Sequence, residues 1–170
     1  MTLDELNRAS GADAHAAFER CCGASRWCAA MVAARPFADR AALLAAAERA
    51  ADALARADWL EAFAHHPRIG DVAALREKFA VTAAWASGEQ RGAAGASEAT
   101  LAALARGNRD YESKFGYIFI VCATGKSAEE MLGLLRARLA NDPAHELTIA
   151  AEEQMKITRI RLEKLLEDAS

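Results

Sequence analysis

The amino-acid sequence predicts an all-α fold, a single compact domain of about seven to nine helices over residues 1–170. Alanine is abundant, and it loses no side-chain entropy when it enters a helix. Proline occurs at three positions, Pro36, Pro67 and Pro143. Helix-capping residues recur ahead of apolar stretches that have a helical period, so the chain can be divided into helices in order.

The first predicted helices are bounded by serine caps, a glycine and a proline. Ser10 predicts the start of a helix that ends at Gly23. Ser25 predicts the start of a second helix, which stops before Pro36. The alanine- and leucine-rich stretch 41–56 follows, and its apolar residues recur at helical spacing.

Acidic residues mark the next two helix starts. Asp39 precedes the stretch 41–56 as its cap, and Asp58 with Glu61 resembles a capping box for the following helix. That helix must end at the two histidines before Pro67, because a residue that precedes proline is disfavoured in the α conformation.

The middle of the chain alternates between turns and helices. Its predicted parts are a turn over 66–71, a helix over 71–80, helical residues over 81–91 and a loop over 92–96. Ser97 then caps a helix that ends at Gly116.

The last third holds a strand-like segment and two helices. Residues 117–123 have strand-like composition, but no second run of this kind exists to pair with them. An unpaired strand leaves its backbone groups unsatisfied, so we interpret this segment as buried helix or extended chain. Ser127 predicts the start of a helix that ends at Asn141. Asp142-Pro143 opens the longest helix, which runs toward Asp168.

Composition limits the classes of partner. The 21 Lys plus Arg residues nearly balance the 24 Asp plus Glu residues, for a net charge of −3. Binding to nucleic acid is therefore not expected, because non-specific binders need an excess of basic residues. No apolar run approaches the roughly eighteen residues of a membrane span, and no signal peptide or peroxisomal address is recognisable. We expect a cytoplasmic protein.

The cysteines and histidines do not predict a metal site. Cys21, Cys22, Cys28 and Cys122 form no CxxC pair, so we expect reduced and mostly buried thiols. The four histidines include no pair at the i, i+4 spacing of a helical zinc site, and no HExxH pattern occurs.

His66 is the first candidate for chemistry. It stands at a helix end directly before Pro67, where an imidazole can project into a cleft. Imidazole titrates near neutral pH, as a general acid–base must. The alternative is an ordinary histidine that interacts with the helix dipole.

Three further polar residues are candidates. On a helix, Glu89 would share a face with Trp85, and burial there could perturb its carboxylate; Gln90 is its neighbour. Arg161 shares a face with apolar residues of the last helix, which favours an ion pair or an anion site. A plain solvated face is the alternative for both Glu89 and Arg161.

Several strings of residues together resemble one enzyme family. They are 64–71, Glu89-Gln90, 108–120, 138–143 and 152–162, and they contain the patterns HPxIG, KFGxxFI and KIxxxRL. Each pattern is short, but their joint order and spacing are specific. Over nearly its whole length the chain resembles the 2-oxo-4-hydroxy-4-carboxy-5-ureidoimidazoline (OHCU) decarboxylases.

The resemblance implies a function and a set of site residues. It implies an all-α homodimer without metal or organic cofactor that converts OHCU to (S)-allantoin and CO2 in urate breakdown. It assigns catalytic roles to His66 and Glu89. The substrate-binding residues that it implies are Pro67, Ala86, Gln90, Phe119, Ile120, Val121, Cys122, Ala123 and Arg161.

The sequence leaves alternatives for the roles of two positions and for the identity of the substrate. Some members of the family carry serine where this chain has Ala86, so a water or Gln90 would have to replace that hydrogen bond. Arg159 competes with Arg161 as the substrate arginine. The alternatives to OHCU decarboxylation are another small heterocyclic substrate or an inactive interaction module, and the intact set of catalytic and binding residues argues against the latter.

Overall fold

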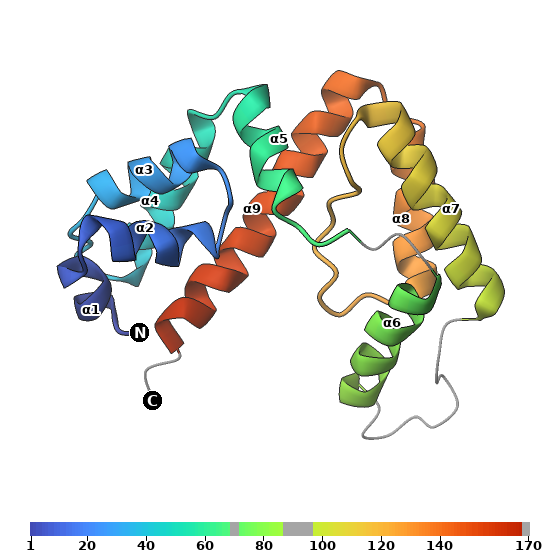
Figure 1. The fold of residues 1–170 in the computed structure, drawn as a ribbon, viewed down its shortest axis with the longest axis horizontal. Helices are drawn as coiled ribbons and strands as arrows, with labels where there is room; N and C mark the ends of the chain where they lie inside the picture. Colours follow the sequence, from blue (N-terminus) through green and yellow to red (C-terminus); the bar gives the residue numbers. More distant parts are fainter. Residues whose placement is uncertain (69–71, 87–96, 168–170) are drawn as a thin grey trace. The chain divides into compact units, whose positions relative to one another are not determined.

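The all-α prediction is confirmed. The computed structural model describes residues 1–68, 72–86 and 97–167, and within these ranges it contains nine α-helices and no strand (Figure 1). The helices are α1 Leu3–Arg8, α2 Gly11–Glu19, α3 Ser25–Ala33, α4 Arg40–Asp52, α5 Arg56–Ala64, α6 Val72–Ala86, α7 Glu98–Phe115, α8 Ala128–Leu139 and α9 Pro143–Glu167.

The contacts between residues divide the chain into two compact units. Unit 1 consists of Met1–His66, Ile120–Cys122 and Leu147–Ser170. Unit 2 consists of Pro67–Phe119 and Ala123–Glu146. The first turn of α9 therefore belongs to unit 2, and the rest of this helix belongs to unit 1.

Several helix ends in unit 1 differ from the prediction. Helix α1, capped by Thr2, was not expected, and α2 ends at Glu19 rather than at Gly23. Ser25 lies inside α3, after the cap residue Ala24, and its hydroxyl donates to a carboxylate instead of capping the helix. The caps Ser10 and Asp39 are confirmed, since each side chain accepts a backbone N–H of its own helix.

The limits of α4 and α5 need correction as well. Helix α4 ends at Asp52 rather than at residue 56, and α5 already begins at Arg56. Asp58 lies in the first turn of α5, where its carboxylate accepts the Ala55 N–H at 2.8 Å. An acidic residue is favourable both at the cap and in the first turn, so the residue type alone does not distinguish the two positions.

The helix signals in the second half of the chain are mostly confirmed. Ser97 caps α7, and Gly116 ends it at a φ of 83°, a left-handed conformation that favours glycine. Helix α6 is continuous to Ala86, whereas the predicted loop over 92–96 lies outside the described residues. Ser127 caps α8, but this helix ends at Leu139 rather than at Asn141.

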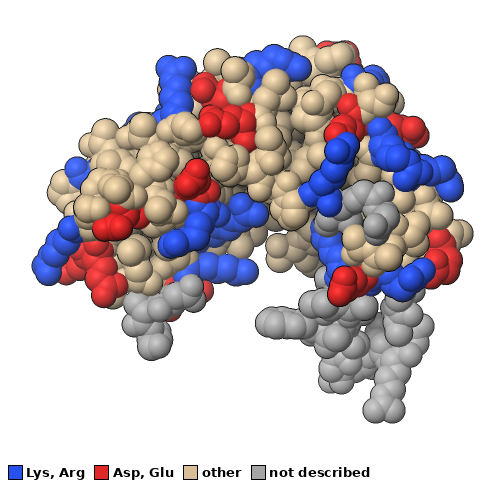
Figure 2. All heavy atoms as spheres, viewed as in Figure 1, with Lys and Arg blue, Asp and Glu red and all other residues tan. Residues whose placement is uncertain are grey.

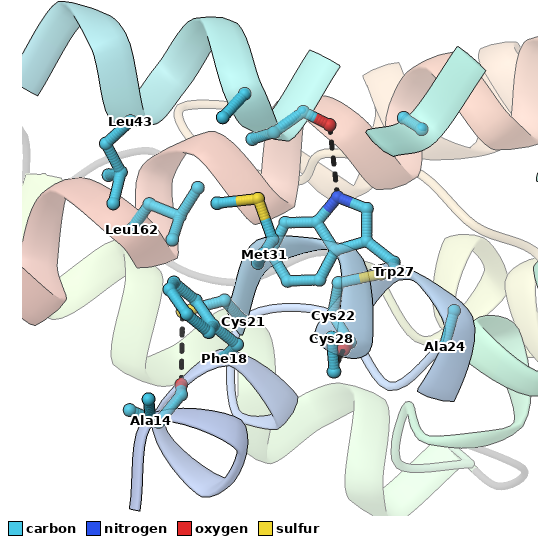
Figure 3. Packing of buried hydrophobic residues seen from close by; sticks show 14 of the residues in the cluster. Ala14, Phe18, Cys21, Cys22, Ala24, Trp27, Cys28, Met31, Leu43 and Leu162 are labelled. Atoms are coloured by element: carbon cyan, nitrogen blue, oxygen red, sulfur yellow. Dashed lines mark hydrogen bonds between the residues drawn. The ribbon is translucent and has the colours of Figure 1, made fainter. Parts of the chain in front are cut away.

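Unit 1 is built around an aromatic and aliphatic core (Figure 3). Trp27 of α3 is fully buried, and its indole Nε1 donates to the Ala47 carbonyl of α4 at 3.1 Å. Phe18 of α2 meets the Trp27 ring edge-on, with 6.0 Å between the ring centroids. Leu162 of α9 is also fully buried in this cluster. Each such burial contributes about 1.5–3 kcal/mol, so the part of α9 after its first turn is an integral part of unit 1.

Unit 2 contains a buried charged cluster where α7, α8 and the start of α9 meet. The Glu146 carboxylate has no exposed surface and accepts from Arg138 Nε at 2.7 Å and from Tyr111 Oη at 2.5 Å. Asn141 Nδ2 donates to its second oxygen at 3.0 Å. A buried charge is tolerated only when it is paired, so these bonds hold the three helices in register. Burial and the bond to Glu146 raise the pKa of Tyr111.

Helices α7 and α8 pack closely in unit 2, side by side in Figure 1. Gly107 of α7 faces Leu135 of α8, and a methyl group at Gly107 would lie 2.5 Å from Leu135 Cδ2. After Gly116 the chain runs through 117–123 without helix or strand. Of the two interpretations of this segment, buried helix is therefore wrong and extended chain is kept.

The surface carries both signs of charge. On the face drawn in Figure 2, basic and acidic side chains are interspersed. No helix among the described residues is long and apolar enough to cross a membrane.

Candidate functional site

His66 lies in the turn that follows α5, as its position before Pro67 predicted. Its backbone N–H donates to the Phe63 carbonyl at 3.1 Å, which closes the end of the helix. The side chain is half-buried. The turn thus holds the imidazole at the surface of unit 1, partly shielded from water.

A chain of hydrogen bonds runs from His66 into the interior of unit 1. The imidazole Nε2 lies 2.5 Å from Oε1 of Gln154 on α9, and Gln154 is fully buried. The Gln154 amide Nε2 donates to Thr158 Oγ1 at 3.1 Å, one turn along the helix. Thr158 is also fully buried. Two buried polar side chains, those of Gln154 and Thr158, therefore support one half-buried histidine.

Gly23 provides the space for this turn. A Cβ atom at Gly23 would lie 2.5 Å from Cβ and 2.6 Å from Cδ2 of His65. Because His65 Cβ is attached to the backbone, a side chain at position 23 would have to displace the turn that carries His66. Glycine is thus required here by close approach rather than by an unusual φ.

The structure distinguishes the two candidate arginines of α9. Arg159 is exposed and pairs with Glu163, at 3.4 Å between Nε and Oε1. Arg161 is half-buried and follows Gln154 by seven residues, so both lie on one face of the helix. Its charge is close enough to Cys21 and Cys22 to lower the pKa of both thiols, against the larger effect of burial.

The cysteines are buried thiols, as expected. None of the four forms a disulfide, and all four are buried. Burial raises the pKa of Cys21 to about 11 and that of Cys28 to about 12, so both stay protonated at neutral pH. They therefore serve as core residues rather than nucleophiles.

The segment around residue 120 contributes to both units. The Phe119 ring belongs to unit 2, where Tyr111 meets it edge-on at 5.2 Å and the Arg138 guanidinium lies 4.6 Å above it. In the adjoining residues, Ile120 and Cys122 are buried, and Val121 and Ala123 are half-buried. Of these, Ile120–Cys122 belong to unit 1 with His66 and Arg161, whereas Ala123 belongs to unit 2.

The remaining predicted residues have a different status. Pro67 is exposed and is the first residue of unit 2. Ala86 is the last residue of α6, and its side chain lies outside the described part of the chain. Glu89 and Gln90 lie outside the described residues, so their predicted roles stay predictions. Within the described ranges, no three His, Cys, Asp or Glu side chains are grouped as a metal site requires.

Gln154, which contacts the His66 imidazole, was not selected as a candidate from the sequence. A signal was available, because an amide and Thr158 occur one turn apart on a helix face that also carries Leu162 and Leu165. Buried polar groups need partners, so such a pair indicates an internal hydrogen bond.

Comparison with known proteins gives the family. A profile of the OHCU decarboxylases matches residues 7–163. The chain belongs to the OHCU decarboxylase family. The uric acid degradation bifunctional protein TTL of Arabidopsis thaliana is 39% identical over 150 residues, which cover 87% of this chain and 46% of that protein. The OHCU decarboxylase of Amia calva is 39% identical over 66 residues, which cover 39% of this chain and 38% of that protein.

Two solved structures share the fold of this chain. A crystal structure of OHCU decarboxylase in the presence of (S)-allantoin has a TM-score of 0.70 and 38% identity, and the match covers 89% of this chain and 97% of that one. A crystal structure of (S)-allantoin synthase also has a TM-score of 0.70, at 17% identity, and this likeness concerns the fold alone. The chain spans less than half the length of the two curated relatives above.

Proposed function

We propose that this chain decarboxylates OHCU to (S)-allantoin and CO2 in urate degradation. The observation that carries the proposal is the family match over residues 7–163. It is supported by the 38% identical relative whose crystals were studied in the presence of (S)-allantoin. The half-buried His66, held against Gln154, is the acid–base group that such a reaction needs.

The chemistry of OHCU accounts for a reaction without a cofactor. Decarboxylation leaves an electron pair on carbon, and pyridoxal or thiamine often accepts it. In OHCU the carbon that loses CO2 adjoins a C=N group, which can accept the pair. The nitrogen of that group gains a proton, the 4-hydroxyl loses its proton to become the carbonyl of allantoin, and a proton adds to the neighbouring carbon. The substrate anion takes up one proton in the overall reaction, and no oxidant is consumed.

The proposed roles follow from these charges. His66 exchanges protons with the 4-hydroxyl and the developing enolate, a contribution of about 100- to 10,000-fold for a general acid–base. Arg161 binds an anionic or carbonyl oxygen of OHCU, and the segment 119–123 contacts its ring. Glu89 and Gln90 bind the ureido and ring N–H groups, with Glu89 also orienting the imidazole or relaying a proton. A fixed imidazole delivers its proton to one face, as formation of one enantiomer requires.

The finer features of the proposal concern assembly and location. We propose that residues 1–170 act as a single OHCU decarboxylase-like domain in a cytoplasmic homodimer without metal or cofactor. Light scattering coupled to size exclusion would report a mass near twice the 18.2 kDa of the chain. Activity that survives a chelator would agree with metal-free chemistry, and activity restored only by metal would contradict it.

The test of the function is a coupled assay. OHCU is generated in situ from urate with urate oxidase and hydroxyisourate hydrolase, and its loss is followed together with the optical activity of the allantoin. We expect the protein to accelerate the loss of OHCU and to yield the S enantiomer. Loss no faster than spontaneous decay to racemic allantoin would refute the proposal.

A further inference from the structure

We propose that Gln154 is a positioning residue that holds the His66 imidazole with its Nε2 protonated, so that proton exchange occurs at Nδ1. The catalytic consequence rests on the proposed decarboxylase function, whereas the ring orientation does not. The geometry behind the proposal lies entirely within unit 1.

The orientation of the Gln154 amide comes from the interior. Thr158 is fully buried, and its hydroxyl oxygen accepts from Gln154 Nε2 at 3.1 Å. The amide oxygen Oε1 is thereby directed to His66, at 2.5 Å from Nε2.

An oxygen without hydrogen can only accept, so the imidazole nitrogen that faces it must donate. His66 Nε2 therefore carries a hydrogen in both the neutral and the protonated ring. Proton gain and loss are left to Nδ1, because the nitrogen that a hydrogen bond fixes decides which tautomer is present. Gln154 thus determines which ring nitrogen acts, 88 residues along the chain from His66.

An amide differs from a carboxylate in this position. A carboxylate would also accept from Nε2, but its negative charge would stabilise the imidazolium and hinder release of the proton. A neutral amide orients the ring without adding charge. Gln154 is therefore suited to a histidine that must both take and return a proton in one turnover.

The first test is spectroscopic and does not depend on activity. In protein labelled with ¹⁵N-histidine, two-bond proton–nitrogen spectra distinguish the two neutral tautomers, and His66→Asn identifies the His66 signals. We expect His66 of the wild-type chain to show a protonated Nε2 in its neutral form. A protonated Nδ1 with bare Nε2 would overturn the proposal.

Variants then test the cause. Gln154→Leu removes the acceptor, and we expect a mixture of His66 tautomers and a fall in kcat of about 10- to 100-fold with little change in KM. Gln154→Glu keeps an acceptor at the same place and should retain the protonated Nε2. Met155→Leu, the next residue on α9 and on another face, is the matched control and should leave the His66 signals unchanged.

The outcomes separate the two proposals. If Gln154→Leu leaves the tautomer and kcat as in the wild type, Gln154 has no positioning role. If Gln154→Leu does not fold, Gln154→Glu and the wild-type tautomer still decide the orientation. A wild-type chain with protonated Nε2 but no activity on OHCU would refute the proposed function and leave the ring orientation by Gln154 supported.

Discussion

Two arginines two residues apart on α9 have different surroundings. Arg159 is exposed and paired with Glu163, whereas Arg161 is half-buried on the face that carries Gln154. An exposed ion pair contributes little, about 0–1 kcal/mol. A partly buried guanidinium can instead bind an oxyanion with two parallel hydrogen bonds. Of the two arginines, Arg161 is therefore the better candidate for binding the substrate.

The two arginines give a prediction with a built-in control. Arg161→Gln should lower kcat/KM on OHCU by about 30-fold or more, because loss of a charged hydrogen-bond partner costs about 2 kcal/mol or more. Arg159→Gln should stay within about twofold of the wild type. Steady-state kinetics of both variants decide between them, and the reverse order of effects would assign the substrate arginine to position 159.

At the scale of elements, the turn between α5 and Pro67 is held from two sides. Gln154 of α9 contacts His66, and the backbone at Gly23, just before α3, lies against His65. Close-packed interiors transmit small displacements, so either contact controls where the imidazole points. The position of His66 thus depends on two segments, around Gly23 and Gln154, that are far from it in the sequence.

Gly23→Ala should disturb this turn. The added methyl group would overlap His65, so we expect a loss of about 1–3 kcal/mol in the free energy of unfolding and a marked loss of activity. Urea denaturation and the OHCU assay measure the two effects. Gly11→Ala is the control, because nothing lies within 4 Å of a methyl group there, and its stability should change by less than about 1 kcal/mol. Equal behaviour of the two variants would show that the turn does not require glycine.

At the scale of the whole molecule, the free energy of unfolding depends on buried thiols that must stay neutral. Burial raises the pKa of Cys21 from 9.0 to about 11 and that of Cys28 from 9.0 to about 12. Both thiols lie in the core of unit 1. At a pH between the unfolded value of 9.0 and these raised values, the folded chain keeps protons that the unfolded chain releases. The free energy of unfolding therefore falls as pH rises through this window.

We therefore expect stability to be fully present below about pH 9 and to be lost as pH rises from there toward about 12. Urea midpoints measured across this alkaline range test the expectation. Cys28→Ala should show a shallower decline than the wild type, because one of the two thiols is gone. A stability that stays constant through the range, or an unchanged slope in the variant, would contradict the assignment of these thiols to the core.

The sequence predicted those features of the fold that depend on neighbouring residues. Helix caps are local hydrogen bonds, so the caps of α2, α4, α7, α8 and α9 were recognised at Ser10, Asp39, Ser97, Ser127 and Asp142. The start of α5 was placed too late, since Asp58 is equally favourable as a cap and in a first turn.

The site was predicted only in part for the same physical reason. The turn at His66 follows from the proline that comes next, which is local information. Its contact with Gln154 joins residues 88 positions apart, and no local pattern encodes such a pair. The resemblance to a family supplied the proposed roles of Glu89, Gln90 and Arg161, which their types and spacing alone left undecided.

The measurement that tests the central claim most directly compares the wild-type chain with His66→Asn in the coupled assay. Asparagine keeps a polar side chain beside Gln154 but exchanges no proton near neutral pH. We expect the rate of (S)-allantoin formation to fall by at least about 100-fold while the circular dichroism of the folded chain is unchanged. Formation of (S)-allantoin at the wild-type rate by His66→Asn would contradict the role of His66 as the acid–base.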